Sequence, residues 1–467
     1  MTKPSSPLVL ASGNTGKIKE LQALLPQFSL LPQTHFSVPE IAETGGTFVE
    51  NAILKARNAA HYSQLPAIAE KSLLTCRYLA IIAVIAAPIS TAVTSVACVL
   101  MLLAWVISGD VWRSLKVSAS QPAGKMLLVF FAWLIISSLY ADTSWANKVT
   151  TLSSWKKLFY TFVLLGLFYQ DQWKKRFIYY YLAAMSFAAV IAASLWLLDI
   201  YVRGAPSAGI VMTNHTSQSL AFVVAVLCCI FLLKEPLSLQ KKSFLVGILI
   251  LFIFNIFFVS PSRSGYLALP VAVFFLMINL YGYKKLPHTL GVMIVALLLV
   301  ALTSSTLQQR IKLAWEENKS SQTSEILTSI GVRDIFRQNT LELIQKKPLL
   351  GYGTSSFKSV YSAHVATKYQ DWRGESQADP HNQYLFVWLE NGLLGLLLFL
   401  VYIYTAIRQG ITQQPYGVIA ASVLVAFAAT SLFNSHFKTF PEGHLLAFFV
   451  GCLLAQKPVG KVEEGIA

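Results

Sequence analysis

The sequence predicts an all-α polytopic membrane protein that begins with a small, truncated α/β segment. The chain has 467 residues, of which 55% are hydrophobic and only 13% charged, whereas soluble domains average about 25% charged residues. Its mean hydropathy is +0.56. Apolar runs of about 18 residues, long enough to span a bilayer, recur after Arg77. Before Glu70 the chain reads like a soluble enzyme, so two kinds of sequence are joined near this point.

The charge distribution supports the membrane assignment. The net charge is +15, and an excess of Lys and Arg in a membrane protein usually lies in cytoplasmic loops. We therefore expect membrane lipid around the helices and no nucleic-acid partner. The 5 cysteines lie in or beside apolar runs, so a disulfide framework is not expected.

The first segment, residues 1–70, contains two stretches typical of a nucleotide-binding enzyme. LVLASGNTGKIKELQALL reads as a strand, a turn suited to phosphate and a helix, and ETGGTFVENAILKARNAA follows it. These motifs resemble the inosine/xanthosine triphosphate pyrophosphatase family. The resemblance implies nucleotide or metal contacts at Asn14, Lys17, Glu50 and Asn51.

The resemblance stops at LPAIAE. The family continues with an acidic Asp-Asp-Ser-Gly motif that carries catalysis, but this chain has Glu70, Lys71, Ser72 and Leu73 there. Membrane spans replace the rest of that domain. We therefore expect no pyrophosphatase active site and no closed core in residues 1–70, which we interpret as a vestigial passenger.

Residues 71–456 form the predicted membrane domain, and residues 457–467 form a short tail. The division at Ser90–Thr91 could be one broken helix or a tight hairpin. Twelve apolar segments are predicted to be helical: 78–90, 91–109, 124–140, 158–169, 177–202, 219–233, 243–259, 265–283, 289–306, 384–407, 416–433 and 444–455.

Orientation follows from the positive-inside rule. With both termini in the cytoplasm, most Lys and Arg residues fall in cytoplasmic loops, and the first span serves as a signal anchor. One loop disagrees, because Lys148, Lys156 and Lys157 lie on the opposite side. The largest hydrophilic stretch, residues 307–382 (the polar segment), then lies outside the cytoplasm.

The polar segment contains a predicted helix in GVRDIFRQNTLELIQKKP. Ile335, Leu341 and Ile344 recur at helical spacing, and Pro348 follows the end. An ordered loop on a helical bundle is where binding and catalytic residues are expected.

The predicted topology gathers several polar groups on the side of the polar segment. They occur in SPSRSG, in the predicted loop helix, in KKPLLGYGTSSF and in DPHNQYL. The candidates are Arg263, Arg333, Arg337, Gly351, Gly353, His381 and Asn382.

Each candidate also has a simpler interpretation. Arg263 could be an interfacial anchor. The two loop arginines could line a solvated helix face or pair with Asp334 and Glu342. His381 could cap the following helix, and glycines punctuate many loops.

Together these residue types indicate a site for a lipid-linked pyrophosphate. Guanidinium groups above a helix amino terminus bind phosphate oxygens. A histidine can remove a proton near neutral pH. The polar segment has no Asp-x-Asp pair and no dense carboxylate cluster, so we expect neither a metal site nor a cofactor.

Residues of about 75 to 456 resemble the O-antigen ligase and polymerase superfamily of bacterial envelopes. The resemblance rests on SPSRSG, GVRDIFRQ, PLLGYGTSSF and DPHNQYLFVWLENGLLG, in that order. It implies a type-C glycosyltransferase-like fold in the inner membrane, with the active site facing the periplasm. The implied reaction moves a polysaccharide from undecaprenyl pyrophosphate to a sugar hydroxyl of lipid A-core.

The resemblance also assigns roles to residues. Arg263 and Arg333 are expected to contact pyrophosphate, and His381 is expected to be the general base of an inverting transfer. Helical spacing adds Arg337 to the substrate-binding residues, together with Gly351, Gly353 and Asn382.

Three alternatives to a ligase remain open at this level. An O-antigen polymerase or a protein O-oligosaccharyltransferase would use the same donor with the same arginine and histidine chemistry. A transporter would place ionisable residues near the middle of the bilayer, but the predicted spans here contain almost none.

Overall fold

The computed structural model describes residues 6–12, 18, 21–22, 28–42, 48–65, 67–68, 72–108, 111–202, 204–205, 207–321, 329–412 and 415–457. Its chain divides into two compact units. The first contains Met1–Ala80, Ser95–Val117 and Lys457–Ala467, and the second contains Ile81–Thr94 and Ser118–Gln456.

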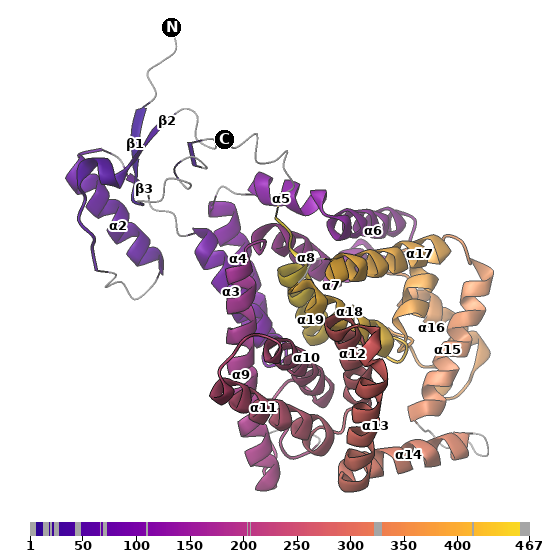
Figure 1. Ribbon diagram of the computed structural model, residues 1–467. Coiled ribbons are helices and arrows are strands. Elements are labelled where there is room, and N and C mark those ends of the chain that lie inside the picture. The colour runs from indigo at the N-terminus through magenta and orange to yellow at the C-terminus, as the bar shows by residue number, and fades with distance from the viewer. Residues whose placement is uncertain are drawn as a thin grey trace. The chain divides into compact units, whose positions relative to one another are not determined.

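The first unit contains a three-stranded parallel sheet in the order β2-β1-β3 (Figure 1). Its strands are β1 (Ser6–Leu10), β2 (Phe28–Pro32) and β3 (Ala67–Ile68). The turn η1 (Gln33–Phe36) and helix α2 (Phe48–Ser63) accompany this sheet. Buried Val9, Ala11 and Ala59 form its hydrophobic cluster among the described residues, with partly buried Phe36, Val38, Leu65 and Ala67 against it.

The predicted strand at the start of LVLASGNTGK is confirmed as β1. Asn14 and Lys17 lie outside the described residues, as does the side chain of Glu50. Asn51 is buried within α2. The predicted nucleotide contacts therefore remain predictions.

All twelve predicted apolar segments are helical. The early helices are α3 (Ser72–Ala86), α4 (Thr91–Ile107) and α5 (Val111–Ser120), so the chain does break near Ser90. The others, with the short α7, are α6 (Pro122–Leu139), α7 (Trp145–Ser154), α8 (Lys156–Leu167), α9 (Asp171–Leu197), α10 (His215–Leu233), α11 (Leu239–Phe254), η2 (Asn255–Val259), α12 (Arg263–Tyr281), η3 (Tyr283–Lys285), α13 (Leu286–Thr303), α17 (Gln383–Thr412), α18 (Gly417–Thr430) and α19 (Phe440–Leu454).

Among the described residues, 7 helices are long and apolar enough to cross a membrane, or 8 if α4 and α5 form one bent span. They are α6, α9, α10, α11 with η2, α12, η3 with α13, and α17. Apolar helices α3, α18 and α19 are shorter, and α8 has only 12 residues. The chain is thus a multi-pass membrane protein, but the predicted number of twelve spans is not confirmed.

Helix packing in the second unit leaves apolar surface on its outside. Helix α12 packs against α18, α17 against α6 and α18, and α19 against α8 (Figure 1). In the most apolar part of the segment formed by η3 and α13, no residue is buried within the protein. Helix α13 exposes Val292, Val295 and Leu299. Surface of this kind is suited to lipid rather than to water.

The lysines that disagreed with the predicted orientation have a packing role. Lys157 is 4% exposed. Its ammonium donates hydrogen bonds to the backbone carbonyls of Lys438 and Thr439, the latter at 2.8 Å. Lys148 is also buried, with its ammonium 5.2 Å from the centre of the Trp145 ring. Two of the three lysines therefore stabilise the fold instead of acting as free loop charges.

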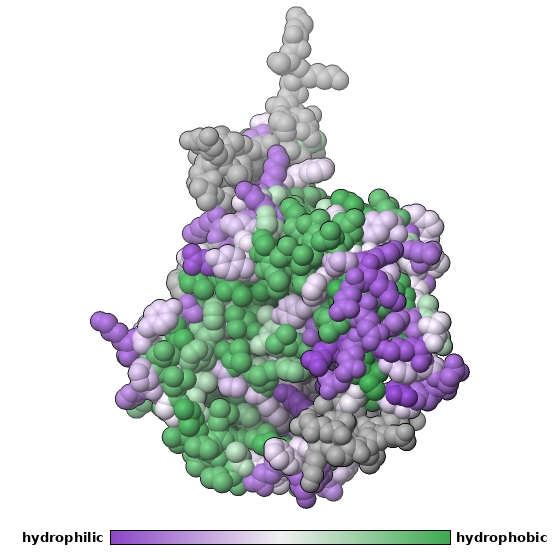
Figure 2. Space-filling model, turned by 90° about the vertical axis from the view of Figure 1, so that its right-hand side faces the viewer, coloured by the Kyte–Doolittle hydropathy of each residue, from purple (hydrophilic) through white to green (hydrophobic). Residues whose placement is uncertain are grey.

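The polar segment is helical. It contains α14 (Ser305–Ser321), α15 (Ser329–Lys346), α16 (Phe357–Lys368) and the 3-10 turn η4 (Trp372–Gly374). On the side where α15 and α16 lie in Figure 1, hydrophilic residues gather into one patch bordered by hydrophobic surface (Figure 2).

The predicted loop helix is confirmed as α15, and the apolar residues that indicated it differ in burial. Ile344 is buried, whereas Leu341 is 37% exposed. The fully buried positions include Asn339 and Thr340, whose side chains are hydrogen-bonded. Apolar periodicity gives no signal for either residue: Asn339 bonds to Lys368 and Tyr369, outside α15, and Thr340 donates to the Phe336 carbonyl within the helix.

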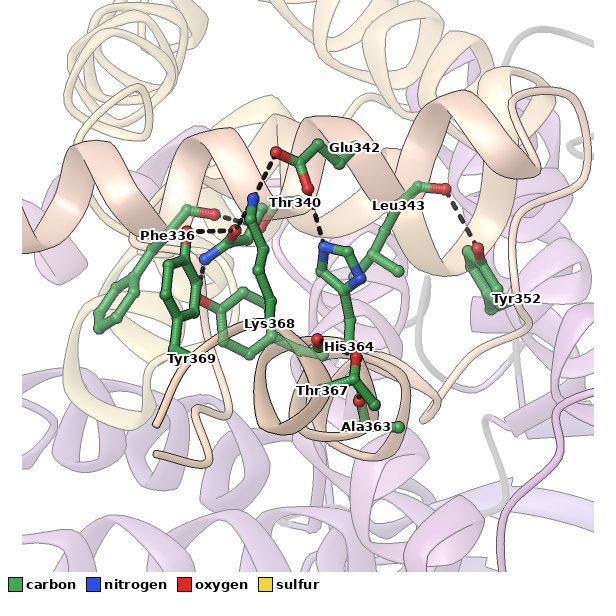
Figure 3. Close-up of polar contacts among 12 residues, drawn as sticks. Phe336, Thr340, Glu342, Leu343, Tyr352, Ala363, His364, Thr367, Lys368 and Tyr369 are labelled. Atoms are coloured by element: carbon green, nitrogen blue, oxygen red, sulfur yellow. Dashed lines mark hydrogen bonds and ion pairs between the residues drawn. The ribbon is translucent and has the colours of Figure 1, made fainter. Parts of the chain in front are cut away.

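A cluster of polar contacts holds α15 against α16 (Figure 3). Glu342 accepts hydrogen bonds from Lys368 at 2.6 Å and contacts His364 at 2.9 Å. Asn339 Oδ1 accepts from Lys368 at 3.1 Å and from the Tyr369 hydroxyl at 3.3 Å. The hydrogen bond from Lys368 lowers the pKa of Glu342. Glu342 therefore binds α16 and does not pair with Arg337.

Candidate functional site

A break in α17 organises the region around the candidate residues. Gly392 interrupts the helix with φ 67° and ψ −176°. A helix break leaves backbone groups without their usual partners. Here the carbonyls of Leu389 and Glu390 accept hydrogen bonds from the N–H groups of Tyr352 (3.0 Å) and Gly353 (2.7 Å).

The exchange is reciprocal. The N–H of Leu393 donates to the carbonyl of Pro348 at 2.8 Å, and the N–H of Leu394 donates to that of Leu349 at 3.4 Å. The motif PLLGYG is thus inserted into the break in α17, and the backbone groups on both sides are satisfied.

Both motif glycines are needed for this close approach. Gly351 and Gly353 have φ values of 68° and 94°, in the region that favours glycine. A Cβ on Gly351 would lie 2.6 Å from Gly392 N, and one on Gly353 would lie 2.6 Å from Ala141 Cβ. The structure gives both residues a packing role, and their predicted contact with substrate stays a prediction.

Gly353→Ala is expected to destabilise the protein. The added methyl would strain the backbone by about 1–3 kcal/mol and force Ala141 and the Ser137 carbonyl, both 2.6 Å away, to move. Gly282→Ala is the matched control, because Gly282 has φ 77° but nothing within 4 Å of its Cβ position. Thermal unfolding in detergent should show a larger loss for Gly353→Ala. Equal losses would contradict the packing argument.

The candidate base lies in the turn before α17. His381 adopts φ 53°, which is uncommon for a residue with a side chain. Its N–H donates to Asp379 Oδ1 at 2.6 Å, and the same oxygen accepts from the Ser435 hydroxyl at 2.8 Å. Asp379 therefore fixes the turn and ties it to residues 431–439 (the 431–439 loop).

Asn382 has a capping role. Its side-chain oxygen accepts from the N–H groups of Tyr384 and Leu385, both at 3.0 Å, at the start of α17. Its amide nitrogen donates to the carbonyl of Leu432 at 3.0 Å. Because both ends of the side chain are bonded within the protein, its predicted substrate contact stays a prediction.

Arg333 and His381 are linked through Phe336 and through the positive charge of Arg333. Phe336 lies one helical turn after Arg333 on α15, and its ring stacks on the His381 imidazole with centroids 6.1 Å apart and planes at 17°. Burial, and to a smaller extent the positive charge of Arg333, lower the pKa of His381, while Asp379 opposes this shift. His381 is therefore neutral near pH 7, which is the form that can accept a proton.

Arg337 is placed differently from Arg333. It is exposed and forms an ion pair with Asp334 at 3.2 Å, within the same helix. This is one of the arrangements that the sequence left open for the loop arginines. Helical spacing alone did not show that Arg333, and not Arg337, lies beside His381.

Arg263 begins α12, directly after a π-helical turn and the Ser-Pro-Ser link. The Ser262 side chain caps this helix by accepting from the N–H of Gly265 at 3.4 Å. Ser264, the next residue after Arg263, accepts from Asn434 Nδ2 at 3.0 Å. Because Asn434 belongs to the 431–439 loop, this loop joins the start of α12 to the turn that carries His381.

A buried polar cluster near this loop was missed in the sequence. Glu442 accepts from the Ser217 hydroxyl at 2.6 Å, and both residues are buried. His436 is 2% exposed, and burial lowers its pKa. The signal was present in FNSHFKTFPEGH, where polar residues crowd between two apolar helices.

Metal ligands are not gathered in the described part of the chain. No group of three or more His, Cys, Asp or Glu side chains there could hold a metal ion. The arrangement of Arg333 and His381 is instead suited to an anion beside a proton acceptor.

Two family models match different parts of the chain. One described as O-antigen ligase matches residues 248–400, and one described as the Ham1 family matches residues 8–82. Both resemblances inferred from the sequence are confirmed. The first match contains the candidate residues, and it supports a membrane enzyme of the O-antigen ligase and polymerase type.

Curated relatives match the amino-terminal segment. A dITP/XTP pyrophosphatase of Coxiella burnetii is 57% identical over 70 residues, which is 15% of this chain and 35% of the relative. The enzyme of the same name from Thioalkalivibrio sulfidiphilus is 58% identical over 67 residues, 14% of this chain and 34% of the relative. The chain therefore spans about a third of these relatives.

A comparison with solved structures finds a partial match. The matching structure is described as "Structural coordination of polymerization and crosslinking by a peptidoglycan synthase complex". The similarity covers 71% of this chain and 96% of that one, with 14% identity and a TM-score of 0.41.

Proposed function

We propose that this protein transfers a polysaccharide from undecaprenyl pyrophosphate to a sugar hydroxyl of lipid A-core, as an O-antigen ligase. The observation that carries the proposal is the position of His381, stacked on Phe336 and beside Arg333, within the matched residues 248–400. A cation and a neutral imidazole are suited to transfer from a diphosphate to an alcohol, because one stabilises the leaving charge and the other accepts the proton.

In the proposed reaction His381 takes the proton from the acceptor hydroxyl. The acceptor oxygen then bonds to the anomeric carbon, while the bond from that carbon to the pyrophosphate oxygen breaks. Attack opposite the leaving group inverts the anomeric configuration. Arg333 and Arg263 stabilise the negative charge that develops on the departing undecaprenyl pyrophosphate.

The proposal includes a location and independence from divalent metal. The polar segment would face the periplasm from the inner membrane, with both termini in the cytoplasm. Arginines would replace a divalent cation at the pyrophosphate. Addition of a chelator is therefore expected to leave the rate unchanged, and inhibition that magnesium reverses would contradict this part of the proposal.

Reconstitution with different acceptors tests the function. The purified protein would be given a lipid-linked glycan together with lipid A-core, a Ser- and Thr-containing peptide, or a second lipid-linked glycan. Transfer to lipid A-core supports the ligase. Transfer to peptide or to the second donor would instead identify a protein O-oligosaccharyltransferase or a polymerase. Solute flux without glycan transfer would favour a transporter.

Deletion of residues 1–70 is expected to leave glycan transfer intact. The candidate site lies wholly in the second unit, at residues 263, 333 and 381. The described part of residues 1–70 contains three short strands, the turn η1, helix α2 and a small apolar cluster. Rates per inserted protein should be compared in vesicles. A truncated protein that inserts normally but makes no product would contradict the passenger interpretation.

A further inference from the structure

A second polar site lies beside the α17 break. It is a cavity of about 510 Å³ between α7, the start of α16 and the 431–439 loop (the polar cavity). From α7 it receives the side chains of Asn147, Thr150, Thr151 and Ser154. Its volume lies in the range of small-molecule binding sites.

The floor of the polar cavity contains unsatisfied polar atoms. Glu390 is 1% exposed, and its Oε1 accepts the N–H of Phe357 at 3.1 Å, which caps α16. Its other oxygen, Oε2, has no hydrogen-bond partner among the described residues. The hydroxyl of Ser355, also part of the lining, has none either. Buried polar atoms without partners are rare and call for an explanation.

The backbone at this position is also strained. Ser355 has φ 88°, although it is not a glycine. Residues held in such conformations cluster at ligand-binding and active sites. Ser355 and Glu390 both line the polar cavity, so the cavity offers an unpaired hydroxyl and an unpaired carboxyl oxygen. A ligand with several hydroxyl groups can complete this arrangement.

We propose that the polar cavity binds a pyranose unit of the glycan substrates. Sugar hydroxyls both donate and accept, so they suit a lining of Ser, Thr and Asn side chains with one carboxylate acceptor. The apolar members of the lining are Phe357 and Ala378, which argues against a lipid tail. Lys358 and Lys438 also line the cavity and add donors for hydroxyl or carboxylate groups of the sugar.

The position of the cavity relates it to the candidate site. Ala378, in its lining, directly precedes Asp379, which holds the N–H of His381. The inference therefore rests on the proposed transfer reaction and names where one of its two saccharides is held. Donor and acceptor glycans both present sugar hydroxyls. The change in KM for each substrate shows which of them the polar cavity binds.

Saturation-transfer NMR on the full-length protein in detergent tests the inference. The probes are the methyl glycosides of glucose, galactose, N-acetylglucosamine and glucuronic acid. Ser359→Phe would fill the cavity from an exposed position on α16, and Ala366→Phe is the control, exposed on the same helix but outside the lining. Glu390→Gln keeps an acceptor for the α16 cap but removes the charge.

We expect at least one glycoside to bind the wild-type protein and the Ala366→Phe variant. Ser359→Phe should abolish the signal, and Glu390→Gln should weaken binding by about tenfold or more. In vesicles, Ser359→Phe should raise the KM for either the donor or the acceptor. The substrate whose KM rises is the one whose sugar binds in the polar cavity. No glycoside bound by the wild type, or equal binding by Ser359→Phe and wild type, would overturn the inference.

The two proposals fail separately. A wild-type protein that binds glycosides but transfers glycan to no acceptor contradicts the transferase and leaves the polar cavity as a saccharide site. A protein whose transfer rate and both KM values are indifferent to Ser359→Phe contradicts the saccharide site and leaves the transferase.

Discussion

Replacing His381 by alanine is expected to lower the rate of glycan transfer by about two to four orders of magnitude. The acceptor hydroxyl is a poor nucleophile until its proton is removed, and His381 is the neutral imidazole beside Arg333. The side chain is half-buried and its backbone is fixed by Asp379, so truncation should leave the turn in place. The rate is measured in vesicles containing lipid-linked glycan and acceptor.

A matched control comes from a second histidine in the polar segment. His364 lies on α16 and contacts Glu342 at 2.9 Å, so its replacement removes a contact between helices and not a proton acceptor of the site. His364→Ala should therefore transfer glycan at close to the wild-type rate. Wild-type activity in His381→Ala, with normal insertion, would remove His381 from the role of base.

The dependence of the transfer rate on pH provides a second test of His381 as the general base. The neutral form of His381 is the active one, so the rate should fall as the pH drops through its pKa. Burial, with a smaller contribution from Arg333, lowers that pKa, so the acid limb should lie below the ordinary imidazole value of about 6.5. Arg333→Ala should move this limb upward. An acid limb that stays in place in this variant would show that Arg333 does not influence the pKa of His381.

The sequence predicted those features that depend on local pattern. Apolar runs identified the helices, and helical spacing followed by a proline identified α15. The same pattern gave no sign that Asn339 on α15 is buried, where it accepts hydrogen bonds from Lys368 and Tyr369. A polar residue whose partners lie on another helix has no local signal.

Long-range pairing also explains what was missed at the site. GYG predicted a turn, but its partner is the break at Gly392, which reads as part of a continuous apolar helix. Glu390 stands in the same run and gave no sign that its carboxylate caps α16. The sequence placed Arg333 and His381 in one site because the predicted topology puts both on the same side of the membrane. The stacking of Phe336, one turn after Arg333, on the His381 ring could not be read from spacing.

Arg333→Ala is expected to reduce transfer by about 3 kcal/mol of transition-state stabilisation, or two to three orders of magnitude in rate. In the proposed reaction the guanidinium meets charge that grows as the pyrophosphate leaves. Arg333→Lys keeps the charge but loses the two-pronged geometry that suits phosphate oxygens. We therefore expect it to recover only part of the rate.

Arg337→Ala is the sharpest control for this prediction. It removes the same side chain from the same helix, one turn away, but Arg337 is exposed and paired with Asp334 at 3.2 Å. Exposed pairs of this kind contribute about 0.2–1 kcal/mol to stability, so the rate should hardly change. Because the two variants lose equal charge, a general effect of charge on substrate attraction would slow both alike. Equal slowing would contradict a specific contact between Arg333 and the leaving pyrophosphate, whereas a large difference between the variants would support it.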